Sequence, residues 1–498
     1  MPRTRPRGGQ RMWSCTPGEA GQPVSHFGCP CHSPALLAAS RRLGRTLSRR
    51  GFVAALGTSA AALALPGRTL AQEPPAAGTR PILLTNFRLF DGSSPQLRDG
   101  LHLLVEGERI AGLATGEATA PEGAQLLDCQ GRTLMPGLID AHWHAVLAAA
   151  SMATLMTASP AYLHLAAAAE AERTLMRGFT TIRDLGGPSF ALKQAIDEGL
   201  VKGPRIYPSG AMITATGGHG DLRQLTDIPR SPDRGLSTIE QMGGAAIVDS
   251  PADVRMRARE QLLQGASQIK LVASGGVSSP RSPIDLSTMT LAELRGGTEV
   301  ATDWNTYATV HAYTPHTMRR AIAAGAHCIE HGHLMDAVTA KLMADNGVWL
   351  SIQPFLSAED TVPLQGPSLV AMRQVLSGTE RAYELAIEHG LKTAFGSDLL
   401  FSAEMATRQG VMLTHLTRWY GNADILRMAT SANGELLALS GPRNPYPGKL
   451  GAVEPGAWAD LLLVDGDPLA DLAPLARPET GLMVIMKGGV IHKNTLEG

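Results

Sequence analysis

Two histidines one residue apart, His142 and His144, follow an apolar run that begins at Met135. In a strand, residues i and i+2 point to the same side, so both imidazoles can reach one metal ion. Taken alone, the pair is weak evidence for a metal site, because two solvated or core histidines can have the same spacing. The prediction of a metal site therefore depends on whether later strands end in side chains of the same chemistry.

Downstream of this pair, apolar β-branched segments alternate with Ala-rich amphipathic ones, which is the pattern of parallel strands joined by helices. The 257 residues from His142 to Asp398 are close to the roughly 250 typical of a (β/α)8 barrel. Active sites of such barrels lie at the C-terminal ends of the strands. We predict eight strands that end near His142, Asp184, Ser209, Lys270, His311, His331, Gln353 and Asp398.

Short strand-like segments with Asp-Gly and Glu-Gly turns precede this centre and return after it. Each set is too small to be stable alone. We therefore predict an α/β protein: a (β/α)8 TIM barrel over residues 136–447, with a small composite β-sandwich built from residues 72–135 and 448–498.

Six residues at or just after the predicted strand ends form a set with metal-site chemistry. They are His142, His144, Lys270, His311, His331 and Asp398. Each one alone could be a hydrogen-bonded core histidine, a lysine that reaches solvent or an aspartate that caps a helix. Together, the imidazoles and the carboxylate suit divalent ions such as Zn²⁺, and more than four ligands indicate two ions. The amine fits if Lys270 is carboxylated by carbon dioxide, because both carbamate oxygens can then bridge the metals.

This set resembles the metal-dependent amidohydrolase superfamily, and the resemblance covers about residues 80 to 495. The segments Thr216–Asp221, Lys270–Val277, Val310–Thr314 and Ile329–His333 are similar to the subgroup of Xaa-Pro dipeptidases, N-acyl-amino-acid hydrolases and ochratoxin-degrading amidohydrolases. The resemblance implies that His142, His144 and Asp398 hold one metal and that His311 and His331 hold the other. Carboxylated Lys270 would bridge them.

The resemblance also implies roles in catalysis and substrate binding. Asp398 would take a proton from a metal-activated water, and the Tyr313 hydroxyl would help to polarise the scissile carbonyl. His219 and Tyr313 would contact substrate, and Arg223, in the same loop as His219, could bind a substrate carboxylate. The alternatives for these loop residues are a histidine that orients a neighbour and a solvated arginine. The segment Pro354–Gly378 is a candidate lid.

The function that follows is hydrolysis of an amide or peptide bond to a C-terminal amino acid, as in a dipeptide, an N-acyl amino acid or ochratoxin A. One alternative keeps the fold but is a mononuclear cyclic-amide hydrolase or deaminase, similar to imidazolonepropionase; Lys270 argues against it. Another is a non-catalytic binding relative, which the complete ligand set argues against.

The first 71 residues have a different character from the rest. They contain ten Arg and one acidic residue, and Ser48-Arg-Arg-Gly-Phe-Val53 precedes a short apolar run and a small-residue cleavage pattern at Ala71. This resembles a twin-arginine export signal, so we expect a periplasmic protein with no stable membrane anchor after processing.

The remaining chain has 34 basic and 44 acidic side chains, which gives no support to nucleic-acid binding. Its partners are expected to be a small amide or short peptide, and the sequence is compatible with a homo-oligomer. Only Cys129 and Cys328 remain after residue 71, so a disulfide framework is not expected.

Overall fold

The computed structural model describes residues 80–229, 235–279 and 281–496. The chain divides into Met1–Ala76 and Ala77–Gly498, and the fold described below belongs to the second unit. The predicted export signal, residues 1–71, lies outside the described ranges. Within those ranges, none of the helices has both the length and the apolar composition needed to cross a membrane.

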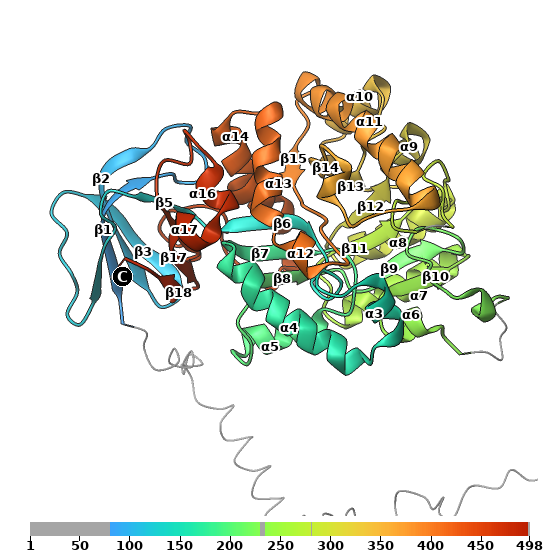
Figure 1. Ribbon diagram of the computed structural model, residues 1–498, viewed down its shortest axis with the longest axis horizontal. Helices are drawn as coiled ribbons and strands as arrows, with labels where there is room; N and C mark the ends of the chain where they lie inside the picture. The colour runs from blue at the N-terminus through green and yellow to red at the C-terminus, as the bar shows by residue number, and fades with distance from the viewer. Residues whose placement is uncertain (1–79, 230–234, 280, 497–498) are drawn as a thin grey trace, which may run out of the picture. The chain divides into compact units, whose positions relative to one another are not determined.

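Strands from both ends of the second unit form one mixed sheet of eight strands, drawn in blue and red in Figure 1. The order is β18-β17-β16-β5-β1-β2-β3, with β4 also paired to β1. The N-terminal and C-terminal strands meet where β5 pairs with β16: Met135 of β5 lies opposite Leu462 of β16 in an antiparallel pair. The strands are β1 (Ile82–Leu89), β2 (Arg98–Glu106), β3 (Arg109–Thr115), β4 (Gln125–Asp128), β5 (Thr133–Pro136), β16 (Leu461–Val464), β17 (Leu482–Lys487) and β18 (Val490–Asn494).

The predicted composite of both chain ends is thus present, but not as two separate stacked sheets. Strand β1 pairs with β2 along one edge and with β4 and β5 along the other, so all eight strands share one hydrogen-bonded network. The sheet encloses its own core, in which Leu84, Leu103 and Leu463 are buried.

The centre of the chain contains the eight predicted parallel strands, and each ends within a few residues of its predicted position. They are β6 (Leu138–Trp143), β7 (Phe179–Asp184), β8 (Arg205–Pro208), β11 (Ile269–Val272), β12 (Ala308–Ala312), β13 (Cys328–His331), β14 (Trp349–Ile352) and β15 (Thr393–Phe395). Two further strands, β9 (Met212–Ala215) and β10 (Ala245–Val248), were not predicted. Because nearly every residue of these strands is buried, the sequence shows continuous apolar runs rather than alternation.

The parallel strands are recorded as two sheets, β6-β7-β8 and β10-β9-β11-β12-β13-β14-β15. Backbone hydrogen bonds join the two sheets on both sides. Ser267 N donates to Pro208 O at 2.8 Å between the β8 and β11 regions, and Asp398 N donates to His142 O at 2.8 Å between the β15 and β6 regions. The carboxyl end of β6 is therefore held directly beside the residues that follow β15.

Helices connect these strands and cover their outer side (Figure 1). Several begin at a Ser or Asp cap followed by Pro or a first-turn acid; the Ser159 and Ser250 side chains, for example, accept hydrogen bonds from the first turns of α4 and α7. The longer helices are α4 (Pro160–Met176), α5 (Phe190–Asp197), α7 (Pro251–Leu263), α8 (Leu291–Asp303), α9 (Pro315–Ala323), α10 (Ala337–Asp345) and α11 (Gly366–Glu388).

Shorter helices fill the connections. They are α3 (Met152–Thr157), α6 (Thr238–Gln241), α12 (Ala403–Ala406), α13 (Gln409–His415), α14 (Asn422–Arg427), α15 (Asn433–Ala438), α16 (Ala473–Ala476) and α17 (Pro478–Gly481), with single turns η2 (Leu225–Asp227), η3 (Ala358–Asp360), η4 (Leu416–Arg418), η5 (Met428–Ala432) and η6 (Gly441–Arg443). The second half of the predicted lid is not loop. Residues 366–378 belong to α11, because Gly366-Pro367 begins the helix instead of marking a turn.

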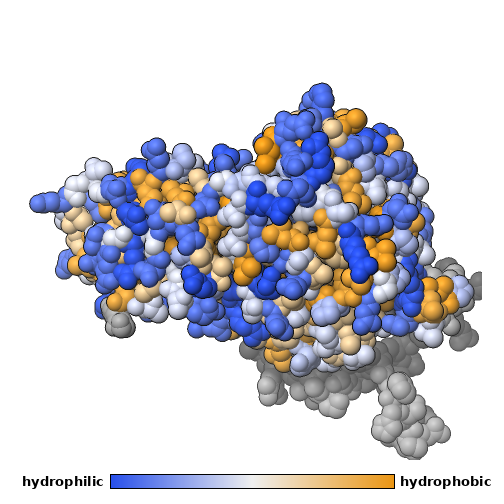
Figure 2. Space-filling view, turned by 45° about the horizontal axis from the view of Figure 1, so that its top comes forward, coloured by the Kyte–Doolittle hydropathy of each residue, from blue (hydrophilic) through white to orange (hydrophobic). Residues whose placement is uncertain are grey.

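The surface drawn in Figure 2 is largely hydrophilic, with hydrophobic side chains in several separate patches. Single exposed apolar residues such as Leu165 on α4 and Leu263 on α7 are common on soluble domains. The chemistry of this chain therefore has to be sought in its cavities.

Candidate metal centre

All six predicted metal ligands line one cavity at the carboxyl ends of the parallel strands. The cavity has an empty volume of about 640 Å³, and its lining includes His142, His144, Lys270, His311, His331 and Asp398, together with His219. His142, Lys270, His311 and His331 lie on β6, β11, β12 and β13, and the other two follow β6 and β15. The structure thus brings together the residues that the strand ends predicted.

Two of these residues have left-handed backbone conformations that non-glycine residues rarely adopt. The φ angles are 74° at His331 and 51° at Asp398. Such conformations cost about 1–3 kcal/mol each and persist only where the surrounding structure fixes them. Both Glu330 and His331, neighbours at the end of β13, are buried.

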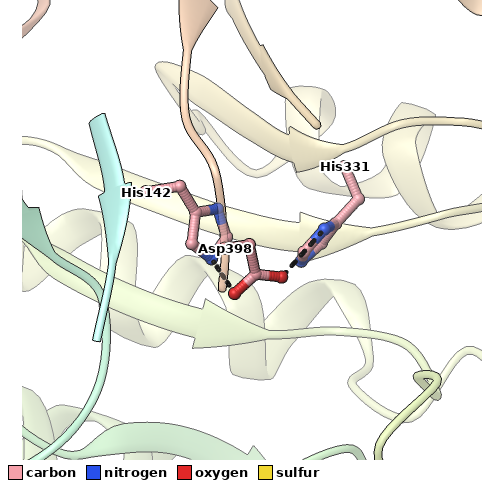
Figure 3. A group of neighbouring side chains, drawn as sticks. All are labelled: His142, His331 and Asp398. Carbon is pink, nitrogen blue, oxygen red and sulfur yellow. Dashed lines mark ion pairs between the residues drawn. The ribbon is translucent and has the colours of Figure 1, made fainter. Parts of the chain in front are cut away.

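The Asp398 carboxylate lies at the centre of the cluster (Figure 3). Its Oδ1 is 3.3 Å from His142 Nε2 and 3.2 Å from His144 Nε2, and its Oδ2 is 3.9 Å from His331 Nδ1. The carboxylate therefore faces imidazoles from two different strands and from the loop after the first.

Two of the imidazoles are oriented by backbone carbonyl groups. His144 Nδ1 lies 3.1 Å from Gly186 O, and His311 Nε2 lies 2.9 Å from Gly275 O. A carbonyl oxygen only accepts, so these nitrogens carry hydrogen, and the opposite nitrogen of each ring offers its lone pair when the ring is neutral.

The other two imidazoles are oriented by side chains. His142 Nδ1 lies 2.8 Å from Glu330 Oε2, and His331 Nδ1 lies 2.7 Å from Gln353 Oε1. Burial lowers the pKa of His142, which keeps its ring neutral. From the sequence alone, Gln353 is predicted only as a strand end and Glu330 has no assigned role; an acidic side chain inside the apolar strand Cys328–His331 is the signal that could have identified Glu330.

This donor set fits a divalent cation. Nε2 of His142 and Nε2 of His144 both face one carboxylate oxygen of Asp398, and a cation between these atoms would be bound by all three once both rings are neutral. Ligand atoms about 2.1 Å from a tetrahedral zinc would lie about 3.4 Å apart, close to the distances from Asp398 Oδ1 to His142 and His144. His142, His331 and Asp398 together form a group whose ligand atoms all lie within 4.8 Å of one another.

Lys270 is 2% exposed and lies in the same cavity. Within the described ranges, no hydrogen bond or ion pair holds its amine. Burial lowers the pKa of Lys270 to about 8. A buried amine without a partner is costly, so this position calls for a chemical explanation.

His219 and Tyr313 stack on the imidazole cluster. His219 lies over His311 with ring centroids 4.6 Å apart, and Tyr313 lies over His331 at 4.8 Å. Burial lowers the pKa of His219 to about 4, and burial also raises that of Tyr313, so both are neutral near pH 7. The His219 Nδ1 is buried without a hydrogen-bond partner in the described part of the chain.

A second cavity of about 560 Å³ adjoins the first and shares His219, His331 and Asp398 with it. Its wall is mainly apolar and includes Phe355, Leu364, Met372, Leu399, Phe401 and Met405. No arginine of the described residues lines either cavity.

Arg223, the predicted carboxylate ligand, lies elsewhere. Its guanidinium pairs with Asp221 at 2.6 Å and donates to Thr216 Oγ1 at 3.1 Å. It lines a neighbouring cavity of about 830 Å³ with Arg281 and Met152, and this cavity shares Leu222 and Ser279 with the metal-ligand cavity. The structure therefore brings His219 and Tyr313 to the metal centre but does not bring Arg223 there.

Comparison with known proteins gives concordant matches. The Amidohydrolase family matches residues 133–491. Ochratoxinase of Aspergillus niger is 27% identical over 430 residues, 81% of this chain and 85% of that protein. A crystal structure of an amidohydrolase is 33% identical with a TM-score of 0.77, covering 84% of this chain and 100% of the other. A crystal structure of a prolidase complexed with N-methylphosphonate-L-proline is 32% identical with a TM-score of 0.76, covering 83% and 100%.

Proposed function

Since this chain belongs to the amidohydrolase family and is a hydrolase, we propose that it is a binuclear metal-dependent enzyme that cleaves an amide bond to a C-terminal amino acid. One observation carries the proposal. A single cavity is lined by four oriented imidazoles, one carboxylate and one buried amine without a partner.

The proposed scaffold is a closed (β/α)8 barrel over residues 136–447, with the composite domain of residues 72–135 and 448–498 beside it. The backbone hydrogen bonds from Ser267 to Pro208 and from Asp398 to His142 support closure, because they join the two parallel sheets on both sides. Closure brings the ends of β6 and β15 together, which the ligand set requires.

In this proposal His142, His144 and Asp398 would hold one divalent ion and His311 and His331 would hold the other, most simply Zn²⁺ in both cases. Lys270, carboxylated to a carbamate, would bridge them; its lack of a partner supports this, since a carbamate changes a repelling cation into a ligand. When bound, the ions supply a water acidic enough to give hydroxide near neutral pH.

The remaining steps fall to the side chains of the cavity. Although burial alone would raise it, His142 and His144 hold the pKa of Asp398 below its usual value, so this carboxylate is ionised and ready to accept a proton. Asp398 takes the proton of the attacking water and passes it to the leaving amine. Tyr313 stays protonated and donates its hydroxyl hydrogen to the carbonyl oxygen of the substrate.

For the substrate, the proposal places an apolar group in the second cavity, against Phe355, Leu364 and Phe401. His219 stacks on His311, has a buried ring nitrogen without a partner in the described part of the chain, and would contact the substrate carboxylate. Arg223 stays a predicted substrate contact, without support from its position. The prolidase and ochratoxinase names of the relatives support dipeptides, N-acyl amino acids and ochratoxin A as substrates to test.

The proposal also retains export to the periplasm through the twin-arginine-type segment with cleavage near Ala71. Fractionation of cells that express the full chain, followed by N-terminal sequencing of the mature protein, tests it. Recovery of an uncleaved cytoplasmic protein would contradict this part alone.

The decisive experiment is metal analysis of the purified protein after incubation with zinc and bicarbonate. It is paired with an activity panel of dipeptides, N-acyl amino acids, lactams and ochratoxin A. We expect about two ions per chain, a carbamate on Lys270 by mass spectrometry under native conditions, and cleavage of linear amides. One ion per chain, unmodified Lys270 and turnover of cyclic amides alone would establish the mononuclear alternative instead. Full metal loading without turnover of any amide would favour a binding protein.

A further inference from the structure

Glu330 is a buried carboxylate beneath the metal centre, and the metal-ligand set gives it no role. Its side chain is fully buried, and its Oε2 lies 2.8 Å from Nδ1 of His142, whose side chain is 1% exposed. Glu330 lies on β13 and His142 on β6, so the contact crosses the interior between distant strands.

The two ends of the Glu330 carboxylate have different partners. Oε1 accepts hydrogen bonds from Arg183 Nη2 at 2.7 Å and from Thr309 Oγ1. Arg183 is also fully buried and donates from Nε to Ala141 O. Arg183 and Thr309 thus satisfy Oε1 of Glu330, and Oε2 remains to accept a hydrogen bond from the His142 imidazole.

A carboxylate with this set of donors only accepts, so it determines which ring nitrogen of His142 carries hydrogen. Nδ1–H points to Glu330 and leaves the lone pair on Nε2, the atom that lies 3.3 Å from Asp398 Oδ1. With the other tautomer, His142 would present an N–H to the centre and could not ligate a cation there. Gln353 Nε2 also approaches His142 Nδ1, at 3.3 Å, but it can only donate, so the shorter contact to Glu330 decides the tautomer.

We infer that Glu330 is a positioning residue that fixes the Nδ1-protonated tautomer of His142 and so sets how tightly the chain holds the ion bound there. The inference rests on the proposed metal centre and goes beyond it, because it assigns the strength of one ligand to a residue that touches neither metal nor substrate. Loss of such an outer hydrogen bond typically weakens metal binding by about 10- to 100-fold.

The test compares Glu330→Gln with a matched control, Glu170→Gln. Glu170 is a carboxylate of α4 that is equally buried and pairs with Arg177 at 2.7 Å, but it has no contact with the metal ligands. Both proteins are loaded with zinc and bicarbonate and then dialysed against a series of chelator concentrations, and retained zinc is measured by mass spectrometry. Thermal unfolding of the metal-free proteins shows how much each change costs the fold.

We expect Glu330→Gln to lose one equivalent of zinc at about 10- to 100-fold lower chelator concentration than the wild type. Glu170→Gln should retain zinc as the wild type does, even where its unfolding temperature falls. If Glu330→Gln does not fold, Glu330→Asp, which keeps the charge but shortens the reach, is expected to give an intermediate loss. Wild-type retention by both Glu330 variants, or an equal loss in Glu170→Gln, would overturn the inference. Failure of the wild type to retain zinc would instead refute the metal centre itself.

Discussion

The metal centre and the junction between the composite sheet and the central parallel strands both bury charged side chains, but the junction pairs its charges whereas the metal centre leaves some without a partner. At the junction, Asp460 accepts from Arg205 at 3.1 and 3.2 Å and from Gly488 N at 2.7 Å. Trp458 lies between two guanidinium groups, with Arg109 3.6 Å and Arg205 3.7 Å from its ring. Every charge there has a partner within the chain.

At the metal centre the balance is the opposite. Nε2 of His142 and Nε2 of His144 both face the Asp398 carboxylate, the Lys270 amine has no partner among the described residues, and His331 and Asp398 have strained backbone angles. Buried polar groups normally find hydrogen-bond partners, so a cluster of exceptions indicates groups reserved for a ligand. Burial and charge alone therefore do not identify a functional site. Buried polar groups that lack a hydrogen-bond or ion-pair partner do.

Of the substitutions that test this comparison, Asp398→Asn is expected to have the largest effect. The proton acceptor is lost while the left-handed backbone is kept, because Asn tolerates that conformation as Asp does. We expect kcat to fall by about 10²- to 10⁴-fold, with no loss of thermal stability. Steady-state kinetics with zinc-loaded protein measure the first and calorimetry the second. Unchanged turnover would show that another group takes the proton.

The counterpart at the junction is Asp460→Asn, which should act on stability and not on chemistry. It leaves the Arg205 guanidinium, 6% exposed, without its counter-charge, and removal of one partner of a buried pair costs about 3–5 kcal/mol. Urea unfolding should show this loss, whereas kcat/KM of the folded fraction should stay at the wild-type value. A fall in kcat without a fall in stability would mean that the junction is coupled to the site.

Two lysines with the same shifted pKa sharpen the contrast. Burial lowers the pKa of both Lys270 and Lys487 to about 8, but Lys487 Nζ donates to Gly203 O at 2.6 Å and Lys270 has no such bond. Lys270→Met should therefore stabilise the metal-free protein by about 1–3 kcal/mol while abolishing retention of two ions. Lys487→Met should destabilise it and leave metal content unchanged. The measurements are urea unfolding in chelator and metal analysis; destabilisation by Lys270→Met would contradict the view that this amine lacks a partner.

The sequence predicted the parallel strands and the six clustered residues because both depend on local signals. Apolar runs marked each strand, and the ligands His142, Lys270, His311 and His331 lie within those runs. What it missed depends on tertiary placement. Glu330 is buried next to the ligand His331 on the same strand, whereas regular alternation would place the two on opposite faces, and β9 is a four-residue strand next to a Gly-rich loop.

Arg223 shows that the sequence is also a limited guide to substrate contacts. Its replacement is expected to have the smallest effect on activity of the changes considered. From the sequence it is a free cation beside His219, but in the structure the carboxylate two residues before it, Asp221, neutralises it. Arg223→Gln alone would leave that carboxylate unpaired, so the informative variant is the double change Asp221→Asn with Arg223→Gln, which removes the pair together. We expect kcat/KM for an N-acyl amino acid to stay within about twofold of the wild type.

His219→Asn, made in parallel, should raise KM, since His219 lines both cavities at the metal centre. A large rise in KM for the double variant, with His219→Asn near the wild type, would return the carboxylate-binding role to Arg223 and place the substrate partly in the neighbouring cavity.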